Sequence, residues 1–102
     1  MIGGNKIKDK AYMKWLHNQF PRCSFPECTE PLLGMNRIEL HHVFGRSRDD
    51  VVIPLCSFHH RNGKVSAHGG PKAFREAFPK EEQIEIARMW REQYEKENKR
   101  PF

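Results

Sequence analysis

The spacing of apolar residues near the start of the chain predicts a short amphipathic helix over 10–19. Asp9 stands immediately before it, and a short acidic side chain there often accepts hydrogen bonds from the first free N–H groups of a helix. Pro21 has no backbone N–H and fixes its own φ, so we expect it to stop the helix. The apolar stripe of this helix consists of Tyr12, Trp15, Leu16 and Phe20.

The middle of the chain has the pattern of a β-hairpin followed by a brief helix. Apolar and polar residues alternate over 37–44, as on a strand with one face buried. A turn-forming segment over 45–50 leads to a second short apolar run, 51–53, which we expect Pro54 to end. A serine then stands where it would cap a short helix over 57–61, and an Asn-Gly pair directly after it would end that helix.

Two more helices are predicted after a sharp bend over 68–71, where Pro71 suits the first position of a helix. The first of them ends at Pro79, and the strongest helical pattern of the chain follows over 81–98. Their apolar faces consist of Ala73, Phe74, Ala77 and Phe78, and of Ile84, Ala87, Trp90 and Tyr94. No stretch approaches the roughly 18 consecutive apolar residues that a membrane helix requires.

Composition adds a reason to look for a metal site. The chain has 102 residues, of which 37% are hydrophobic and 30% charged, so it can bury only a small core. Domains this small usually need an additional staple, such as a structural metal. The three cysteines cannot all pair with one another, and no run near the N-terminus resembles a signal peptide. We therefore expect a reduced, cytoplasmic setting, in which clustered Cys and His residues favour metal over disulfides.

Residue types that bind metal gather in two short clusters far apart in the sequence. Cys23 and Cys28 lie in a proline-rich loop, and Cys56 is closely followed by His59 and His60. Thiolates and a neutral imidazole are the ligands that Zn²⁺ prefers in closed tetrahedral sites. We predict a structural zinc bound by Cys23, Cys28, Cys56 and His59, because the C-x2-H spacing matches the usual knuckle, with His60 as the alternative fourth ligand.

A formal net charge of +5 favours a polyanionic partner, nucleic acid first. Several cations stand close to the histidine-rich segments, where contacts with phosphates would supply affinity without reading base sequence. The candidate DNA-binding residues are Arg46, Arg48, Arg61, Lys64, Lys72 and Arg75. Nothing resembles a separate recognition helix, so strong sequence specificity is not expected from this chain alone.

Three motifs accompany the predicted order of strand, turn, strand and helix: His41-His42, Asp49-Asp50 and Cys56-x2-His59-His60. In this combination the chain resembles the HNH endonucleases, whose core is a ββα-metal finger that zinc knuckles often flank. Similarity to small phage and prophage HNH nucleases associated with recombination rests on four more motifs: Tyr12-x2-Trp15-Leu16, the following Pro21-Arg-Cys23, Ile53-Pro-Leu-Cys56 and His68-Gly-Gly70. The resemblance covers roughly residues 12–78.

The resemblance implies a role for four of the histidines. His42 matches the family's general base, His41 the position that holds the catalytic metal, and His60 a second ligand of that metal. His68 would be a third ligand or a phosphate contact, or else an ordinary turn histidine. Neighbouring residues on a regular strand point to opposite faces, so His41 and His42 reach one site only if the strand bends. Asp50 stands where the family usually has Asn, and we expect it to orient the base or to bind the metal.

The resemblance therefore implies a metal-dependent DNA endonuclease that nicks or cuts phosphodiester bonds and leaves 5′-phosphate and 3′-hydroxyl ends. Its expected setting is phage DNA recombination, repair or packaging in the host cytoplasm. The catalytic ion would be Mg²⁺ or Mn²⁺, alternatively Ni²⁺ or Zn²⁺, beside the structural Zn²⁺. The alternative function is a non-catalytic, zinc-stabilised module that binds nucleic acid. We expect one α+β domain over 1–102, a zinc-stapled ββα-metal finger (about 21–70) flanked by an N-terminal helix and by C-terminal helices over about 71–98.

Overall fold

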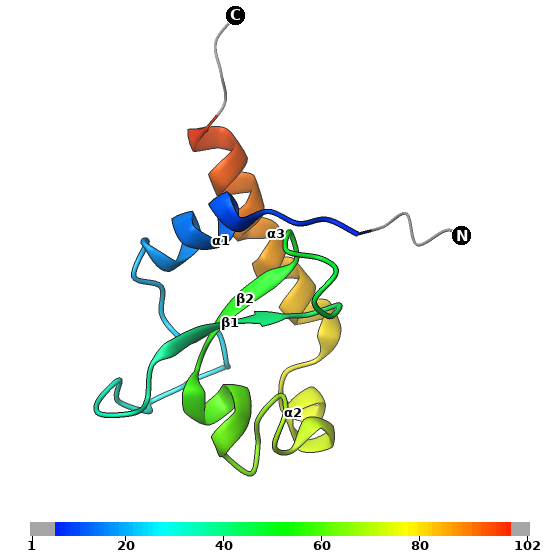
Figure 1. Cartoon of the computed structure of the whole chain (residues 1–102). Coiled ribbons are helices and arrows are strands. Elements are labelled where there is room, and N and C mark those ends of the chain that lie inside the picture. The colour runs from blue at the N-terminus through cyan, green and yellow to red at the C-terminus, as the bar shows by residue number, and fades with distance from the viewer. Residues whose placement is uncertain (1–5, 99–102) are drawn as a thin grey trace, which may run out of the picture.

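An antiparallel hairpin of β1 (Ile38–His42) and β2 (Val52–Cys56) lies at the centre of the fold (Figure 1). The computed structural model describes residues 6–98, so residues 1–5 and 99–102 of the predicted domain lie outside the described residues. A helix precedes the hairpin, a single helical turn follows it directly, and two further helices come after that turn. These elements are α1 (Lys10–His17), η1 (Phe58–Asn62), α2 (Pro71–Ala77) and α3 (Lys80–Glu97). This is the predicted α+β arrangement of an N-terminal helix, a hairpin and C-terminal helices.

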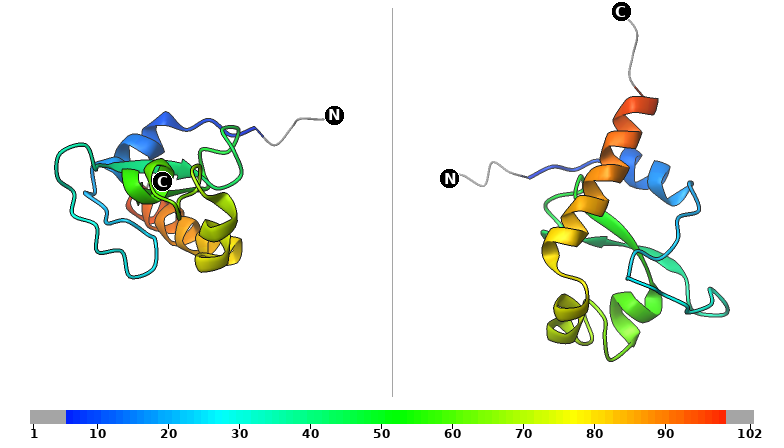
Figure 2. Two further views of the ribbon diagram at one scale, coloured as in Figure 1. Left: turned by 90° about the horizontal axis from the view of Figure 1, so that it is seen from below. Right: turned by 180° about the vertical axis from the view of Figure 1, so that it is seen from behind.

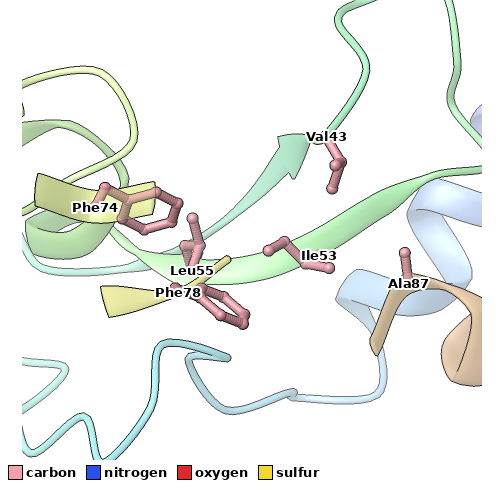
Figure 3. Packing of buried hydrophobic residues seen from close by; sticks show 6 residues of the cluster. All are labelled: Val43, Ile53, Leu55, Phe74, Phe78 and Ala87. Carbon is pink, nitrogen blue, oxygen red and sulfur yellow. The ribbon is translucent and has the colours of Figure 1, made fainter. Parts of the chain in front are cut away.

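Apolar side chains from the helices cover both faces of the hairpin. Ile53 and Leu55 of β2 pack on one face against α2 and the first half of α3 (Figure 3). Val52 packs on the other face against α1 and the second half of α3. Because α3 runs along the hairpin, it contributes to both clusters and joins the two halves of a small core (Figure 2). The fully buried members are Val43, Ile53, Leu55, Phe74, Phe78 and Ala87 in the first cluster, and Tyr12, Leu16 and Val52 in the second.

The N-terminal helix forms as predicted but ends earlier. The Asp9 Oδ1 accepts a hydrogen bond from the backbone N–H of Tyr12 at 3.0 Å, which confirms Asp9 as the cap. The helix ends at His17, well before Pro21. Phe20 is 91% exposed and has a φ of +52°, so its assignment to the apolar stripe is wrong. The left-handed conformation of this residue changes the direction of the chain, and Pro21, in place of Phe20, is buried.

The hairpin has the predicted order, but β2 is longer than predicted because Pro54 does not end it. Pro54 lies in the middle of β2, opposite Leu40. Hydrogen-bonded and non-hydrogen-bonded pairs alternate along an antiparallel ladder. The backbone N–H of Val43 donates to the carbonyl of Val51 at 3.0 Å, and counting from this pair puts Leu40 and Pro54 in a non-hydrogen-bonded position. The N–H that proline lacks is therefore not needed by the ladder.

The predicted helix after β2 is present as a single turn of π-helix, in which the N–H of Gly63 donates to the carbonyl of Phe58 at 2.8 Å. Ser57 does not cap it, contrary to expectation. Its hydroxyl instead accepts a hydrogen bond from the backbone N–H of Arg37 at 3.1 Å and donates to the carbonyl of the same residue at 3.2 Å. Ser57 thus ties the start of η1 to the residue that precedes β1.

The two C-terminal helices agree closely with the prediction. Pro71 is the first residue of α2, and α3 runs over Lys80–Glu97 where 81–98 was expected. Phe74 and Phe78 are buried, whereas Ala77 is exposed and does not belong to the buried face of α2. Within residues 6–98, no helix combines the length and the apolar character needed to cross a bilayer.

Candidate functional site

Four side chains from two distant segments converge near the hairpin in a candidate metal site. One ligand atom from each of Cys23, Cys28, Cys56 and His59 lies within 4.8 Å of the others. The His59 Nδ1 is 3.4 Å from the Cys56 Sγ and 3.7 Å from the Cys23 Sγ, and the sulfurs of Cys28 and Cys56 are 4.0 Å apart. A tetrahedral Zn²⁺ with Zn–S of about 2.3 Å and Zn–N of about 2.0 Å requires roughly 3.5 Å between sulfur and nitrogen and roughly 3.8 Å between sulfurs. The cluster therefore has the dimensions of a site that could bind Zn²⁺.

The loop that carries the first two cysteines is held against β2 and η1. The backbone N–H of Ser24 donates to the carbonyl of Pro54 at 2.8 Å, on the edge of β2 that faces away from β1. The ring of Phe25 stacks on the imidazole of His59, with ring centroids 4.1 Å apart and planes 9° apart. These contacts bring the loop next to Cys56, the last residue of β2.

Burial makes this cluster a poor place for a free thiolate. It raises the pKa of the Cys23 thiol to about 12 and raises the pKa of Cys28 as well. Burial also lowers the pKa of His59, which keeps its imidazole neutral. A bound Zn²⁺ would offset the cost of forming the thiolates, because metal ligation favours the deprotonated sulfur. The chemistry of the donor set and its spacing therefore both fit a site that could bind Zn²⁺.

His41, His60 and His68 form a second cluster, in which one ring nitrogen of each lies within 4.8 Å of the others. They come from β1, from η1 and from the bend before α2. The His60 Nδ1 lies 2.7 Å from the Glu39 Oε1. An ionised carboxylate can only accept a hydrogen bond, so the Nδ1 donates and the lone pair of the His60 Nε2 stays free. Glu39 therefore fixes the ring of His60, as a carboxylate that accepts the other ring N–H often does for a metal-binding histidine.

Two members of this cluster, His41 and His60, have pKa values that favour the neutral imidazole. Burial lowers the pKa of His41 to about 4, and the nearby imidazoles of His60 and His68 act in the same direction. Burial also lowers the pKa of His60, although the hydrogen bond to Glu39 opposes this. Neutral imidazoles that converge to this spacing are suitable ligands for a divalent cation.

His42 is held by an aspartate, but by Asp49 and not by Asp50. Its Nε2 lies 2.9 Å from the Asp49 Oδ1. Burial opposes the ionisation of Asp49, yet hydrogen bonds from the backbone N–H of Asp9 and from His42 hold the pKa of this carboxyl below its ordinary value. Asp50 instead makes a bidentate ion pair with Arg48, with both N···O distances 2.8 Å, and this pairing lowers the pKa of Asp50. The carboxylate beside the candidate base is therefore the residue before the predicted one.

A chain of contacts extends from Asp49 to α3. The Asp49 Oδ2 accepts a hydrogen bond from the backbone N–H of Asp9 at 2.8 Å. The Asp9 Oδ2 in turn accepts from the Arg91 Nη1, also at 2.8 Å. Asp9 therefore caps α1, holds Asp49 and binds α3 at once. Both α1 and α3 thus support the carboxylate that holds His42.

His41 and His42 border the same hollow of about 250 Å³ although they are neighbours on a strand. β1 is paired along one edge only, so side chains from both of its faces can reach around the unpaired edge. The expected bend is therefore not required for the two side chains to meet one ligand. The hollow is also bordered by Leu40, Gly45, Arg46, His60, Arg61 and His68.

The predicted DNA-binding cations differ in their surroundings. Arg46 and Arg61 border the hollow, and Arg61 also forms an ion pair with Glu39 at 3.1 Å. Arg48 does not border it, and its charge is compensated by Asp50. The remaining candidates, Lys64, Lys72 and Arg75, are exposed.

Sequence reasoning missed Glu39 and Asp49. Glu39 stands two residues before His41, so strand alternation puts both on one face, and this spacing is the signal that could have found it. Nothing in the sequence distinguishes Asp49 from its neighbour, because the choice depends on the path of the turn between the strands.

The two-stranded hairpin, the helix that follows it and the Cys3His cluster are together compatible with a ββα-metal motif. No family model, no curated protein and no solved structure matches this chain.

Proposed function

We propose that this protein is a metal-dependent endonuclease that hydrolyses phosphodiester bonds of DNA. The observation that carries the proposal is that His41, His60 and His68 border one open hollow together with His42, whose ring Asp49 holds from outside the hollow. The resemblance to HNH endonucleases supports the same conclusion, because those motif histidines are the ones that meet here. The setting in phage recombination, repair or packaging, and in the cytoplasm, rests on the resemblance alone.

The three clustered histidines would hold the catalytic ion through neutral ring nitrogens, and Glu39 would keep the His60 ring in place. When bound, a divalent cation supplies Lewis-acid stabilisation of the phosphoryl and leaving oxygens. The fit rests on the donor set, since imidazole suits Ni²⁺ and Zn²⁺ best, and three protein ligands leave positions open for oxygen ligands.

His42 has the geometry of a general base. Because the Asp49 carboxylate can only accept, the His42 Nε2 donates to it and the Nδ1 keeps a free lone pair. That nitrogen would take a proton from a water molecule as the water attacks phosphorus, opposite the departing 3′ oxygen. The Asp49 carboxylate would stabilise the imidazolium that forms. The products would carry a 5′-phosphate and a 3′-hydroxyl.

The remaining parts of the site would hold the DNA and the frame. Arg46 and Arg61 border the hollow without any carboxylate in its lining, which suits a phosphate backbone. The Cys3His cluster would bind structural Zn²⁺ and hold η1, the turn that carries both His59 and His60.

Cleavage of supercoiled plasmid by the purified protein tests the proposal, with Mg²⁺, Mn²⁺, Ni²⁺ or no added ion. We expect metal-dependent nicking that His42→Ala abolishes. His17→Ala is the matched control, because His17 is an exposed histidine outside both clusters. No cleavage with any ion by a folded, zinc-loaded protein that binds DNA would instead favour the non-catalytic nucleic-acid-binding module.

A further inference from the structure

A second, smaller hollow of about 150 Å³ lies on the other side of His41. It is enclosed by β1 and by the start of α2 and of α3, and Phe74, Arg75 and Lys80 border it. The His41 ring is a wall common to both hollows. The centroid of the His41 ring is 5.3 Å from that of His60, which belongs to the histidine cluster, and 6.2 Å from that of Phe74, which borders the second hollow. Because only the His41 side chain separates the two hollows, an extended polymer bound in the first hollow can continue into the second.

The charge of this second hollow is positive and uncompensated. Arg75 and Lys80 are both exposed, and among the described residues neither forms an ion pair. No carboxylate borders the hollow. The Lys80 Nζ lies 5.6 Å from the centre of the Phe44 ring, a cation–π distance that keeps the ammonium close to the hairpin.

A third hollow, of about 340 Å³, shows the contrasting case. It lies between the turn after β1 and the middle of α3, and Asp50, Glu92 and Glu95 border it together with Arg88. Arg88 forms ion pairs with Glu85 and with Glu92. Cations near the middle of α3 are therefore neutralised by acidic neighbours, whereas those beside His41 are not.

We propose that the hollow bordered by Arg75 and Lys80 is a phosphate subsite, which binds the DNA backbone at a phosphate next to the one lying at His41, His60 and His68. The proposal rests on the proposed function, and it names Lys80, a residue that charge patterning alone did not single out. Two phosphate sites separated by one imidazole fix the direction in which a strand crosses the end of β1. Such contacts position the backbone and carry no base sequence information.

The salt dependence of DNA binding tests this subsite without any cleavage. The zinc-loaded protein, with no catalytic ion added, is titrated into a fluorescent duplex oligonucleotide at several salt concentrations. Each phosphate contact contributes about 0.9 to the slope of log K against log [salt]. We therefore expect Arg75→Ala or Lys80→Ala to reduce the slope by about 0.9. Between about 50 and 200 mM salt, the loss of affinity of each variant should then be roughly 3.5-fold smaller than that of the wild-type protein. Arg88→Ala removes the same charge from a paired cation and should leave the slope unchanged.

A neutral methylphosphonate placed at single backbone positions then locates the contact. It should weaken binding of the wild-type protein at one position beside the scissile phosphate and have no further effect on Lys80→Ala. Slopes of both variants equal to that of Arg88→Ala would overturn the subsite. If plasmid is cleaved and the slopes are equal, the subsite fails and the nuclease stands. If plasmid is not cleaved but the slopes fall, the subsite stands as part of a binding module.

Discussion

The adjacent residues Asp49 and Asp50 offer a matched pair of substitutions. Asp49→Asn and Asp50→Asn remove the same charge one residue apart, but only Asp49 contacts the candidate base. We expect Asp49→Asn to lose most of the cleavage activity and Asp50→Asn to keep it. The two variants therefore distinguish Asp49, which contacts His42 in the structure, from Asp50, which the sequence predicts in this role.

The expected magnitudes follow from the contacts of each carboxylate. Asp49 is 4% exposed and accepts hydrogen bonds from His42 at 2.9 Å and from Asp9 at 2.8 Å. An asparagine has one acceptor oxygen and can satisfy only one of them, and each bond to a charged group contributes about 1.5–3 kcal/mol. We expect a loss of stability of about that size. The cleavage rate should fall by a factor of about 10² or more, as for loss of an oriented general base.

The ion pair between Asp50 and Arg48 is partly exposed, with side-chain exposures of 19% and 30%. Pairs of this kind contribute about 0.2–1 kcal/mol, so Asp50→Asn should change stability little and cleavage hardly at all. Plasmid cleavage gives the rates, and urea unfolding gives the stabilities. Nitrogen NMR of the His42 ring reports its tautomer independently of activity, and it should change in Asp49→Asn only. Full activity in Asp49→Asn together with a loss in Asp50→Asn would refute the reasoning.

Four further outcomes are expected. The purified protein should contain one tightly bound Zn²⁺, and Cys28→Ser should lose both the ion and the cooperative melting transition; a variant that melts normally without zinc would contradict the structural site. Glu39→Gln should weaken binding of the catalytic ion about 10- to 100-fold by calorimetry while keeping one zinc, because the His60 ring loses its carboxylate partner. Phe74→Ala should cost about 3–5 kcal/mol in urea unfolding, since Phe74 is 2% exposed between β2 and α2. The pKa of His41 lies at about 4 in the folded state and near 6.5 in the unfolded state, so between these values the unfolded protein binds more protons, and stability without a catalytic ion should fall as the pH drops from about 6.5 to 4. Unfolding curves of His41→Gln should show a smaller loss of stability over this pH range. An equally large loss in that variant would exclude His41 as the cause.

Features with local causes were predictable from the sequence. Asp9 caps α1 and Pro71 begins α2, because the free N–H groups and the fixed φ that decide these positions involve only nearby residues. Cys23 and Cys56 could be brought together from spacing and ligand chemistry, since few other arrangements satisfy four such ligands. The C-x2-H spacing favours His59 over His60 on the same ground.

Features that depend on the path of the backbone were missed. A proline usually ends a strand. Pro54 is tolerated within β2 because it stands at a non-hydrogen-bonded position of the ladder, and only the register with β1 decides which positions those are. The choice between Asp49 and Asp50 depends on a turn whose residue Gly45 has a φ of +88°. Phe20 is left exposed by a left-handed conformation that no pattern of apolar residues reveals.

Pro54 also has a consequence for the fidelity of folding. Its carbonyl points to the outer edge of β2, where Ser24 binds it, so its missing N–H would point there too. A misfolded hairpin in which β2 is rotated by half a turn about its axis would turn this proline toward β1 and lose a ladder hydrogen bond. The same rotation would bring Ile53 and Leu55 out of the cluster with Phe74. Pro54 therefore disfavours the rotated arrangement of β2. In this way it helps to keep the Cys56 side chain on the side of the strand where Cys23, Cys28 and His59 lie.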